Sequence, residues 1–146
     1  MTEPIIVQHA KWIHLPRIED GIDGTISVAE NNNPIPFAIK RVYYIYDLFN
    51  PHAIRGKHAH KALEQVLFCI SGSCEIGLDD GTATQTLVLD KPQTGVYLGV
   101  ELWHTMKRFS HNCILLVLAS DLYNETDYIR DYDDFLKHVG NTIKNK

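Results

Sequence analysis

The chain has 146 residues, of which 45% are hydrophobic, and its formal net charge at pH 7 is −4. This length is enough for one domain, residues 1–146, with a substantial core, and the acidic balance excludes a broad basic surface for nucleic acid. The longest apolar run, Cys113–Ala119, is too short to cross a bilayer, and the N-terminus lacks a charged-then-apolar leader. We therefore expect a cytoplasmic protein without nucleic-acid or membrane partners.

Short runs rich in β-branched and aromatic residues follow one another, separated by Gly, Pro, Asn and Asp, which is typical of an antiparallel all-β domain. The expected strands are Ile5–Ile13, Thr25–Ala29, Phe37–Tyr46, Glu64–Ile70, Ser73–Asp79, Thr84–Leu89, Gly95–Gly99 and Asn112–Ser120. Ser71-Gly72 indicates a turn, and Asp80-Gly81 indicates a type I′ hairpin turn with positive φ at both central residues. We predict a cupin-like jelly roll. A lipocalin-like up-and-down barrel is the alternative, although it usually needs a longer chain.

The hydrophobic period changes near the C-terminus. Apolar side chains recur there at helical spacing, at Tyr128, Ile129, Tyr132, Phe135, Leu136 and Val139. Asn124, with Asp127 three residues later, is a plausible N-terminal cap. We expect one amphipathic C-terminal helix that packs against the sheet.

The cysteines Cys69, Cys74 and Cys113 are odd in number and fall inside strand-like segments without metal-type spacing. A disulfide framework is not indicated by this pattern. We expect reduced thiols in the core.

His58 and His60 lie two positions apart, just ahead of an apolar strand. Because side chains alternate between the two faces of a strand, they are expected to point the same way as Glu64, Val66 and Phe68. Buried polar groups are costly unless they find partners. Two imidazoles and a carboxylate in a hydrophobic interior therefore indicate a functional site rather than a solvated strand end.

The expected strand Phe37–Tyr46 carries two further candidates. If its odd-numbered positions face inward, Arg41 and Tyr43 project into the same cavity as the histidines. The alternative is that Arg41 extends to the barrel mouth while Tyr43 is an ordinary core residue.

A second aromatic and imidazole group, Tyr97 and His104, follows later in the chain. Cupin metal sites take two histidines and a glutamate from one motif and a histidine from another. His58, His60, Glu64 and His104 match such a ligand set for a transition metal. Histidines that exchange protons with a substrate need the same kind of cavity, so the spacing leaves both uses open.

Arg55 and Lys57 flank the first histidine, in the loop Pro51–Lys57. A positive loop at a barrel mouth is suited to a phosphate or pyrophosphate, with Arg forming paired hydrogen bonds and Lys acting as a point charge. The alternative is a solvated charged loop.

A set of segments in a fixed order completes the pattern: Pro36–Ile45, Arg55–Lys61, Leu63–Gln65, Gly72–Cys74, Leu78–Gly81, Trp103–His104 and Glu125–Arg130. Together they closely resemble the bacterial sugar 3,4-ketoisomerases, which convert dTDP-4-keto-6-deoxyglucose to its 3-keto isomer. The resemblance implies a cupin-like jelly roll that works without a metal or other cofactor. It also implies a homodimer with exchanged N-terminal strands, acting before an aminotransferase and an acetyltransferase in making 3-acetamido-3,6-dideoxyhexoses for surface glycans such as lipopolysaccharide O-antigen.

The resemblance also implies roles for individual residues. By motif match, His58 is the catalytic base, Tyr43 forms a hydrogen bond with it, and His60 is the second active-site histidine. Arg41 and Arg55 match arginines near the substrate. Further substrate-binding candidates are Lys57, Asp23, Glu64, Tyr97 and His104.

Two positions depart from the family pattern. Asp23-Gly24 stand where relatives carry a basic or aromatic residue, in a region that bears on which face of carbon 4 is protonated. Thr105 follows Trp103-His104 where Glu is common. The configuration of the product at carbon 4 therefore stays open.

Two other functions fit the same residues. A metal-dependent cupin enzyme would use the histidines as ligands, and a non-catalytic barrel would bind a nucleotide sugar without turnover. Metal analysis separates the first from an isomerase, and turnover of a dTDP-4-keto sugar separates the second.

Overall fold

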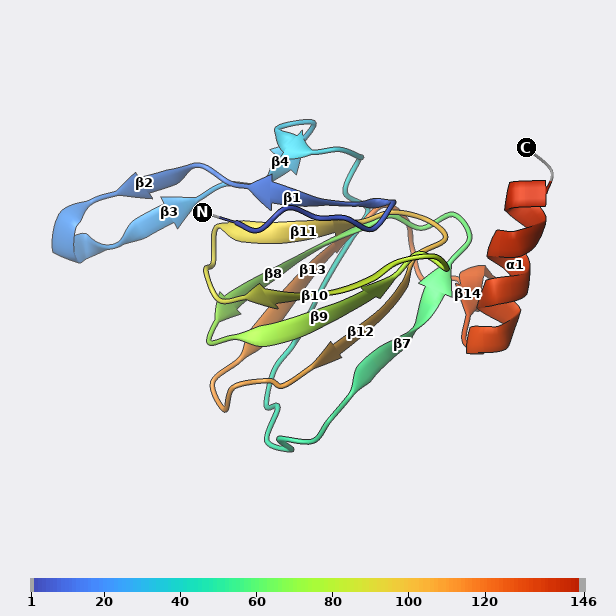
Figure 1. Cartoon of the computed structure of the whole chain (residues 1–146). Helices are drawn as coiled ribbons and strands as arrows, with labels where there is room; N and C mark the ends of the chain where they lie inside the picture. The colour runs from blue at the N-terminus through green and yellow to red at the C-terminus, as the bar shows by residue number, and fades with distance from the viewer. Residues whose placement is uncertain (1, 145–146) are drawn as a thin grey trace.

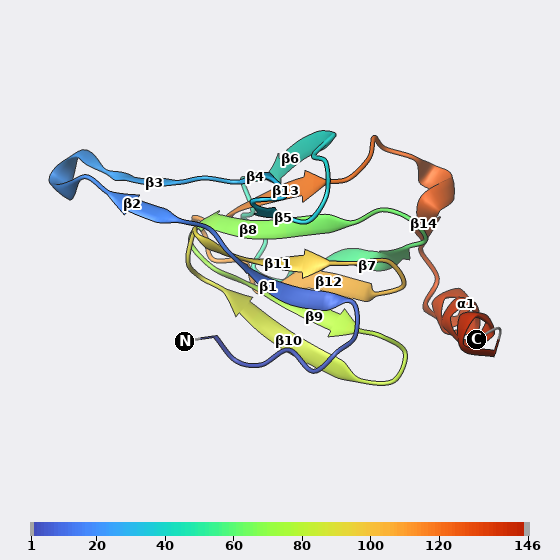
Figure 2. The same ribbon diagram turned by 90° about the horizontal axis from the view of Figure 1, so that it is seen from above.

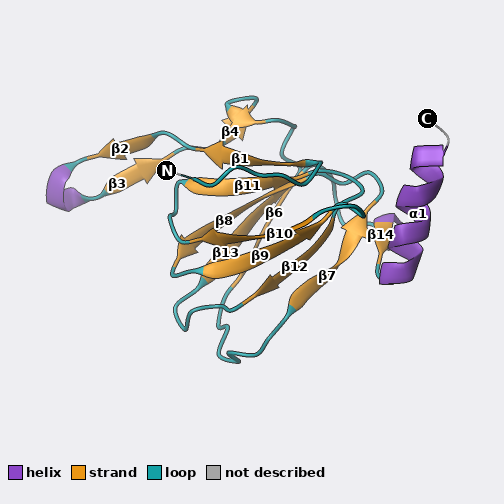
Figure 3. Cartoon of the chain, in the orientation of Figure 1, coloured by secondary structure: helices purple, strands orange, loops and turns teal. Residues whose placement is uncertain are grey.

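The computed structural model describes residues 2–144, and strands dominate this range (Figures 1 and 3). The strands are β1 (Ala10–His14), β2 (Arg17–Glu19), β3 (Thr25–Ser27), β4 (Glu30–Asn31), β5 (Pro34–Ile35), β6 (Arg41–Ile45), β7 (Arg55–His60), β8 (Gln65–Ser71), β9 (Cys74–Asp79), β10 (Thr84–Leu89), β11 (Thr94–Leu98), β12 (Trp103–Lys107), β13 (Ile114–Ala119) and β14 (Tyr128–Ile129). The helical segments are η1 (Gly21–Asp23), η2 (Glu125–Asp127) and α1 (Tyr132–Lys144). No helix in this range is long and apolar enough to span a membrane.

Two five-stranded antiparallel sheets within these residues form the body of the molecule, in the orders β1-β11-β8-β13-β6 and β10-β9-β12-β7-β14 (Figure 2). Leu67, Ile76 and Leu115 belong to the apolar core between them. The chain passes repeatedly from one sheet to the other, so most hydrogen-bonded neighbours are not consecutive in sequence. The predicted cupin-like jelly roll is confirmed. The up-and-down alternative, in which each strand pairs with its sequence neighbours, is wrong.

The predicted strands are present, but several of their boundaries differ. The strand expected over Ile5–Ile13 begins at Ala10, and the one expected over Phe37–Tyr46 begins at Arg41. Two strands that position the site, β7 and β12, are missing from the list of expected strands, although the alternation expected for His58 and His60 assumes an extended chain there. The residues of β7 include few apolar side chains, and this strand is held by backbone pairing with β12 and β14, which are distant in sequence.

The expected common face of the histidines and the next strand is wrong. The strand β7 belongs to one sheet and β8 to the other, so alternation does not continue through the connection between them. Val66 and Phe68 lie in an outer cluster with Ile13 and Phe37, whereas the intervening Leu67 faces the central core. Both faces of β8 are buried because the N-terminal part of the chain covers its outer side, so hydrophobicity alone did not identify the inner face.

The C-terminal helix is amphipathic, as expected, but it starts later than predicted. Asn124 caps η2 instead of α1, with its Oδ1 accepting a hydrogen bond from the Thr126 amide at 3.2 Å. Tyr128 and Ile129 extend the sheet as β14. The helix α1 begins at Tyr132. The residue immediately before it, Asp131, accepts a hydrogen bond from the Asp134 amide through its Oδ1. Its buried side packs on the outside of the sheet through a cluster of Ala59, Ile129, Phe135 and Val139.

One of the two predicted turns differs in type. Gly72 has a φ of 70° in the turn between β8 and β9, as Ser71-Gly72 indicated. Between β9 and β10, the Asp80 amide donates to the Ala83 carbonyl, so Gly81 and Thr82 are the central residues. Only Gly81 of these two has a positive φ, so the turn is not type I′.

The hairpin formed by β2 and β3 extends away from the body, at the end opposite α1 (Figures 1 and 2). Its apolar residues Ile18, Ile22 and Ile26 are 54%, 103% and 60% exposed. The hairpin therefore presents to solvent side chains that usually lie in a core or an interface.

Candidate active site

Three histidine rings from neighbouring strands of the sheet β10-β9-β12-β7-β14 lie close together. His58 and His60 project from the same face of β7, and His104 on β12 is paired with His58 in the antiparallel register. The ring of His58 lies 4.9 Å from that of His60 and 4.6 Å from that of His104, between centroids. His60 and His104 are buried and His58 is partly exposed. The alternation of β7 and the pairing with β12 thus create one imidazole cluster.

Each of these rings uses Nδ1 for a hydrogen bond within the protein. His58 Nδ1 lies 3.0 Å from the Gly56 carbonyl oxygen, and His104 Nδ1 lies 3.3 Å from the Leu102 carbonyl oxygen. A carbonyl only accepts, so both Nδ1 atoms carry the proton, and Nε2 of the neutral rings is left with a free lone pair.

Burial keeps the cluster uncharged at neutral pH. It lowers the pKa of His58 to about 4, helped by the neighbouring His60. Burial also lowers the pKa of His60, despite the opposing effect of the Asp127 carboxylate, and it holds the pKa of His104 well below the usual value. The charged form loses its hydration inside the protein, which is why the shift is downward. Neutral imidazoles are proton acceptors, and they are also the form that binds metals.

A cavity of about 430 Å³ opens beside the cluster. It is lined by Arg41, Tyr43, Ile45, Ile54, Arg55, Gly56, His58, Met106, Tyr128 and Arg130. The predicted inward face of the Arg41–Ile45 strand is correct, because Val42 and Tyr44 are 54% and 60% exposed while Tyr43 lies against the core. The cavity thus combines a neutral base with guanidinium and phenol donors.

The hydroxyl of Tyr43 accepts a hydrogen bond from Gln65 Nε2 at 2.9 Å, rather than bonding to His58. Burial raises the pKa of Tyr43, so the phenol stays protonated and remains a donor to a bound ligand. The guanidinium of Arg41 lies 5.3 Å from the centre of the Tyr43 ring, and its Nε is buried without a hydrogen-bond partner among the described residues. An unpartnered buried donor beside a cavity is suited to an oxygen of a ligand.

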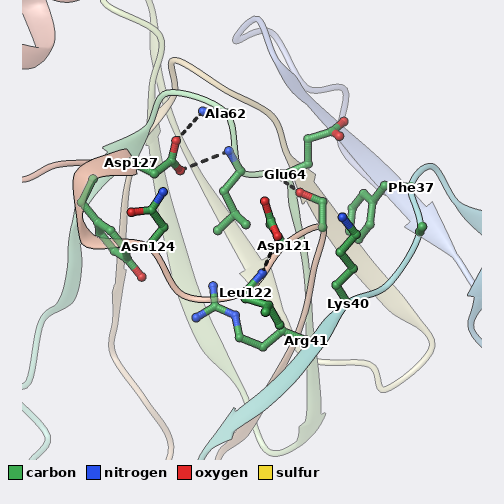
Figure 4. A pocket seen from close by; sticks show the side chains of 13 residues that line it. Phe37, Lys40, Arg41, Ala62, Glu64, Asp121, Leu122, Asn124 and Asp127 are labelled. Carbon is green, nitrogen blue, oxygen red and sulfur yellow. Dashed lines mark hydrogen bonds between the residues drawn. The ribbon is translucent and has the colours of Figure 1, made fainter.

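Asp127 is a site residue that the sequence analysis missed. Its carboxylate accepts a hydrogen bond from His60 Nδ1 at 3.1 Å. It also accepts hydrogen bonds from the amides of Ala62 and Leu63 at 2.7 and 3.1 Å (Figure 4). The sequence pattern predicts Asp127 to be part of a helix cap instead. The resemblance to the ketoisomerases contained the relevant segment, Glu125–Arg130, but gave Asp127 no role.

Tyr128 and Arg130, from the same segment, complete the wall of the cavity. The Tyr128 ring lies 4.9 Å from His58 and 4.5 Å from His60, between centroids. Arg130 stacks over that ring at 4.2 Å and also forms hydrogen bonds of 2.7 and 2.9 Å with Glu125. Tyr128 and Arg41 also line a second cavity of about 370 Å³, together with Lys40, Glu64 and Asp121 (Figure 4).

Other sequence candidates lie apart from the cluster. Tyr97 packs in the outer cluster and donates a 2.5 Å hydrogen bond to Glu64, which lines the second cavity. Lys57 is exposed and is not among the residues lining the first cavity, whereas Arg55 is. Asp23 lies in η1, at the tip of the projecting hairpin (Figure 1).

The sequence left a four-residue metal set open as an alternative, and the described structure brings only three of its members together. Among the described residues, the group with ligand atoms within 4.8 Å of one another contains His58, His60 and His104 but not Glu64. Glu64 lies in the connection between β7 and β8, and its carboxylate accepts a hydrogen bond from Tyr97 instead. Three neutral imidazoles remain able to hold a transition metal ion.

A family model described as FdtA: WxcM-like, C-terminal, matches residues 8–140 of the chain. The chain belongs to this family. A curated relative from Aneurinibacillus thermoaerophilus, called TDP-4-oxo-6-deoxy-alpha-D-glucose-3,4-oxoisomerase, is 51% identical over 129 residues, which cover 88% of this chain and 91% of that protein. The family resemblance noted in the sequence is confirmed.

Solved structures of sugar 3,4-ketoisomerases share the fold of this chain. A 3,4-ketoisomerase from Helicobacter canadensis has a TM-score of 0.85 and 47% identity, covering 90% of this chain and 97% of its own. The sugar 3,4-ketoisomerase QdtA from Thermoanaerobacterium thermosaccharolyticum, in complex with TDP, has a TM-score of 0.90 and 39% identity, covering 94% and 98%. A histidine-to-asparagine mutant of QdtA is in complex with TDP-4-keto-6-deoxyglucose.

Proposed function

We propose that this protein is a sugar 3,4-ketoisomerase that converts dTDP-4-keto-6-deoxyglucose to the 3-keto isomer without a cofactor. The observation that carries the proposal is a neutral imidazole, His58, in the wall of a cavity lined by arginines, with the rings of His60 and His104 next to it, in a member of this family. The relative at 51% identity is named for this activity, which supports the same substrate here.

The reaction moves two protons. The carbonyl at carbon 4 acidifies the hydrogen on carbon 3, and Nε2 of His58 removes that hydrogen as a proton. The released electron pair forms a double bond between carbons 3 and 4, which gives an enediolate. The His58 imidazolium then protonates carbon 4, while the proton on oxygen 3 passes to oxygen 4. The fixed tautomer of His58 supports this role because its Nε2 is the unprotonated nitrogen.

His60 is the candidate for moving the oxygen-bound proton. Its Nε2 is buried without a hydrogen-bond partner among the described residues, and its ring adjoins that of His58. Arg41 and Tyr43 supply donors to the enediolate oxygens. Such preorganised donors stabilise developing negative charge more strongly in a buried site than in water.

Asp127 acts through His60 as a positioning residue. Its two backbone hydrogen bonds, from Ala62 and Leu63, hold the carboxylate in place. The carboxylate in turn holds His60 with the proton on Nδ1 and the lone pair on Nε2. This orientation fits a ring that accepts and returns a substrate proton.

Arg55 and Arg130 are suited to the diphosphate of the nucleotide sugar. Both line the cavity next to His58, and guanidinium groups bind phosphate oxygens through paired hydrogen bonds. The exposed Lys57 adds positive charge beside them.

The functional unit is a homodimer that exchanges N-terminal strands. The projecting hairpin with exposed Ile18, Ile22 and Ile26 supports this arrangement, because a second chain would bury these side chains. The tip residue Asp23 would then reach the partner's surface instead of its own cavity.

The protein is cytoplasmic, and its 3-keto product passes to an aminotransferase and an acetyltransferase for surface glycans such as O-antigen.

Incubation with dTDP-4-keto-6-deoxyglucose in D₂O, followed by NMR, tests the proposal. We expect a 3-keto product with deuterium at carbon 4, because the imidazolium proton exchanges with solvent. Binding of dTDP without turnover would support a non-catalytic barrel instead. Activity that is lost on chelation and restored by a transition metal would support a metal-dependent cupin enzyme.

A further inference from the structure

Cys69, Cys74 and Cys113, here called the three-cysteine cluster, meet at one end of the sandwich. Cys69 lies on β8, Cys74 begins β9, and Cys113 directly precedes β13. Their sulfur atoms all lie within 4.8 Å of one another, and Cys69 Sγ is 3.6 Å from Cys113 Sγ. None of the three is more than 1% exposed, and all three are free thiols. The fold thus joins sulfur atoms whose sequence spacing shows no motif.

The cluster is separate from the histidines. Leu78 on β9 is paired with His104, and Cys74 lies four residues away on the same strand. At about 3.3 Å per residue, this separation is about 13 Å. The proposed isomerisation therefore leaves these thiols without a role.

Apolar packing alone does not require this arrangement. Elsewhere the same core is filled mostly by aliphatic side chains, such as Leu87 and Val117, which pack without specific pairing. In the three-cysteine cluster, three separate segments of the chain each contribute one sulfur atom, and the three sulfur atoms lie together. An ion bound to three sulfurs at about 2.3 Å in a trigonal plane would hold them about 4.0 Å apart, which is close to the spacing already present.

We propose that Cys69, Cys74 and Cys113 form a three-thiolate site for a soft metal cation. Thiolates select soft, thiophilic ions over hard ones. Binding breaks three S–H bonds, forms three metal–sulfur bonds and releases three protons to the buffer. With a divalent cation the site keeps one negative charge, whereas three unpaired thiolates would be far more costly to bury.

Two short loops adjoin the cluster and form hydrogen bonds with it. The turn after β8 and the loop before β13 are joined by reciprocal hydrogen bonds of 2.9 Å between Ser73 and Ser110. The Cys69 thiol donates to the Ser71 carbonyl, and the Cys113 amide donates to the Ser110 carbonyl. Local opening of these partly exposed loops gives a small ion a path to the sulfurs.

Titration of the reduced protein with Cd²⁺ in oxygen-free buffer, continued to constant absorbance, tests the site. We expect the thiolate-to-metal charge-transfer band to saturate at one Cd²⁺ per three-cysteine cluster, with proton release and a raised melting temperature. Cys74→Ala and Cys113→Ala should each weaken this binding by more than about 100-fold, since losing even an outer partner of a ligand costs 10- to 100-fold. A wild-type protein with three free thiols and no such band would overturn the proposal.

Two controls test whether the Cd²⁺ signal comes from the three-cysteine cluster and whether the cysteine variants are folded. His60→Asn disrupts the histidine cluster, and the charge-transfer band of this variant should match the wild type. The melting temperature of each cysteine variant without metal establishes that it is folded before its affinity is compared. Equal binding by wild type and both folded cysteine variants would assign the Cd²⁺ elsewhere and would contradict the proposal.

Discussion

The carboxylate of Asp127 accepts a hydrogen bond from Nδ1 of His60 at 3.1 Å, across 67 positions of sequence. Since this contact fixes the ring nitrogen that faces the site, we expect Asp127→Asn to lower kcat by about 10- to 100-fold, in the range seen for partners of functional histidines. The amide can donate to Nδ1 and so favour the opposite tautomer. The variant should also shift the pH profile of kcat, because Asp127 raises the pKa of His60 against the larger effect of burial.

Asp121→Asn is the matched control for Asp127, because Asp121 is an exposed carboxylate lining the second cavity. It should leave the pH profile unchanged. If both variants lost activity equally without a change in that profile, Asp127 would have no positioning role.

His58→Asn should lower turnover by about a hundred- to ten-thousandfold, which is the usual contribution of a general base. The side chain is only partly buried, so the variant should remain folded and bind dTDP with near-normal affinity. Steady-state kinetics and calorimetry of dTDP binding give the two measurements. Near-normal turnover in a folded His58→Asn variant would transfer the role of base to another group.

Tyr43→Phe removes one hydroxyl that faces the cavity and leaves the ring in place. We expect it to reduce turnover more than it reduces the melting temperature, because the hydroxyl serves a bound substrate as well as Gln65. Tyr44→Phe is the control, since Tyr44 is 60% exposed on the other face of β6. The inward assignment of Tyr43 predicts little effect at Tyr44, and equal losses in the two variants would contradict it.

The imidazole cluster should make the protein less stable in mild acid. The pKa of His58 falls to about 4 in the folded state, from an ordinary value of about 6.5, so between these values the unfolded chain binds more protons than the folded chain. The free energy of unfolding therefore decreases as the pH falls from about 6.5 toward 4. For His58 alone the loss between pH 7 and pH 5 is on the order of 2 kcal/mol. Urea denaturation at the two pH values measures the difference, which should shrink in His58→Asn; a pH dependence unchanged by this substitution would argue against the shift.

Asp23→Arg should change the ratio of carbon 4 epimers in the product, or the Michaelis constant. Asp23 lies at the tip of the projecting hairpin, so any such effect must come through the partner subunit of an exchanged dimer. NMR of the product gives the epimer ratio, and sedimentation of the same variant shows whether it is a dimer. A dimer whose product ratio and Michaelis constant were both unchanged would place Asp23 outside the site.

Several features of this protein follow from the sequence by itself. The β class follows from short alternating runs, and the inward direction of Arg41 and Tyr43 follows from the two-residue period of one strand. The shared face of His58 and His60 has the same origin. These properties are local, because alternation holds within any continuous strand wherever that strand packs.

Only the tertiary structure decided which residues from other parts of the chain lie next to these side chains. Alternation could not be carried from His60 to Val66, because the chain changes sheets between them. The pairing of His104 with His58, the contact of Asp127 with His60, and the meeting of Cys69, Cys74 and Cys113 all depend on registers between strands far apart in sequence. Such registers are set by how the two sheets pack as a whole, so no local pattern in the chain encodes them.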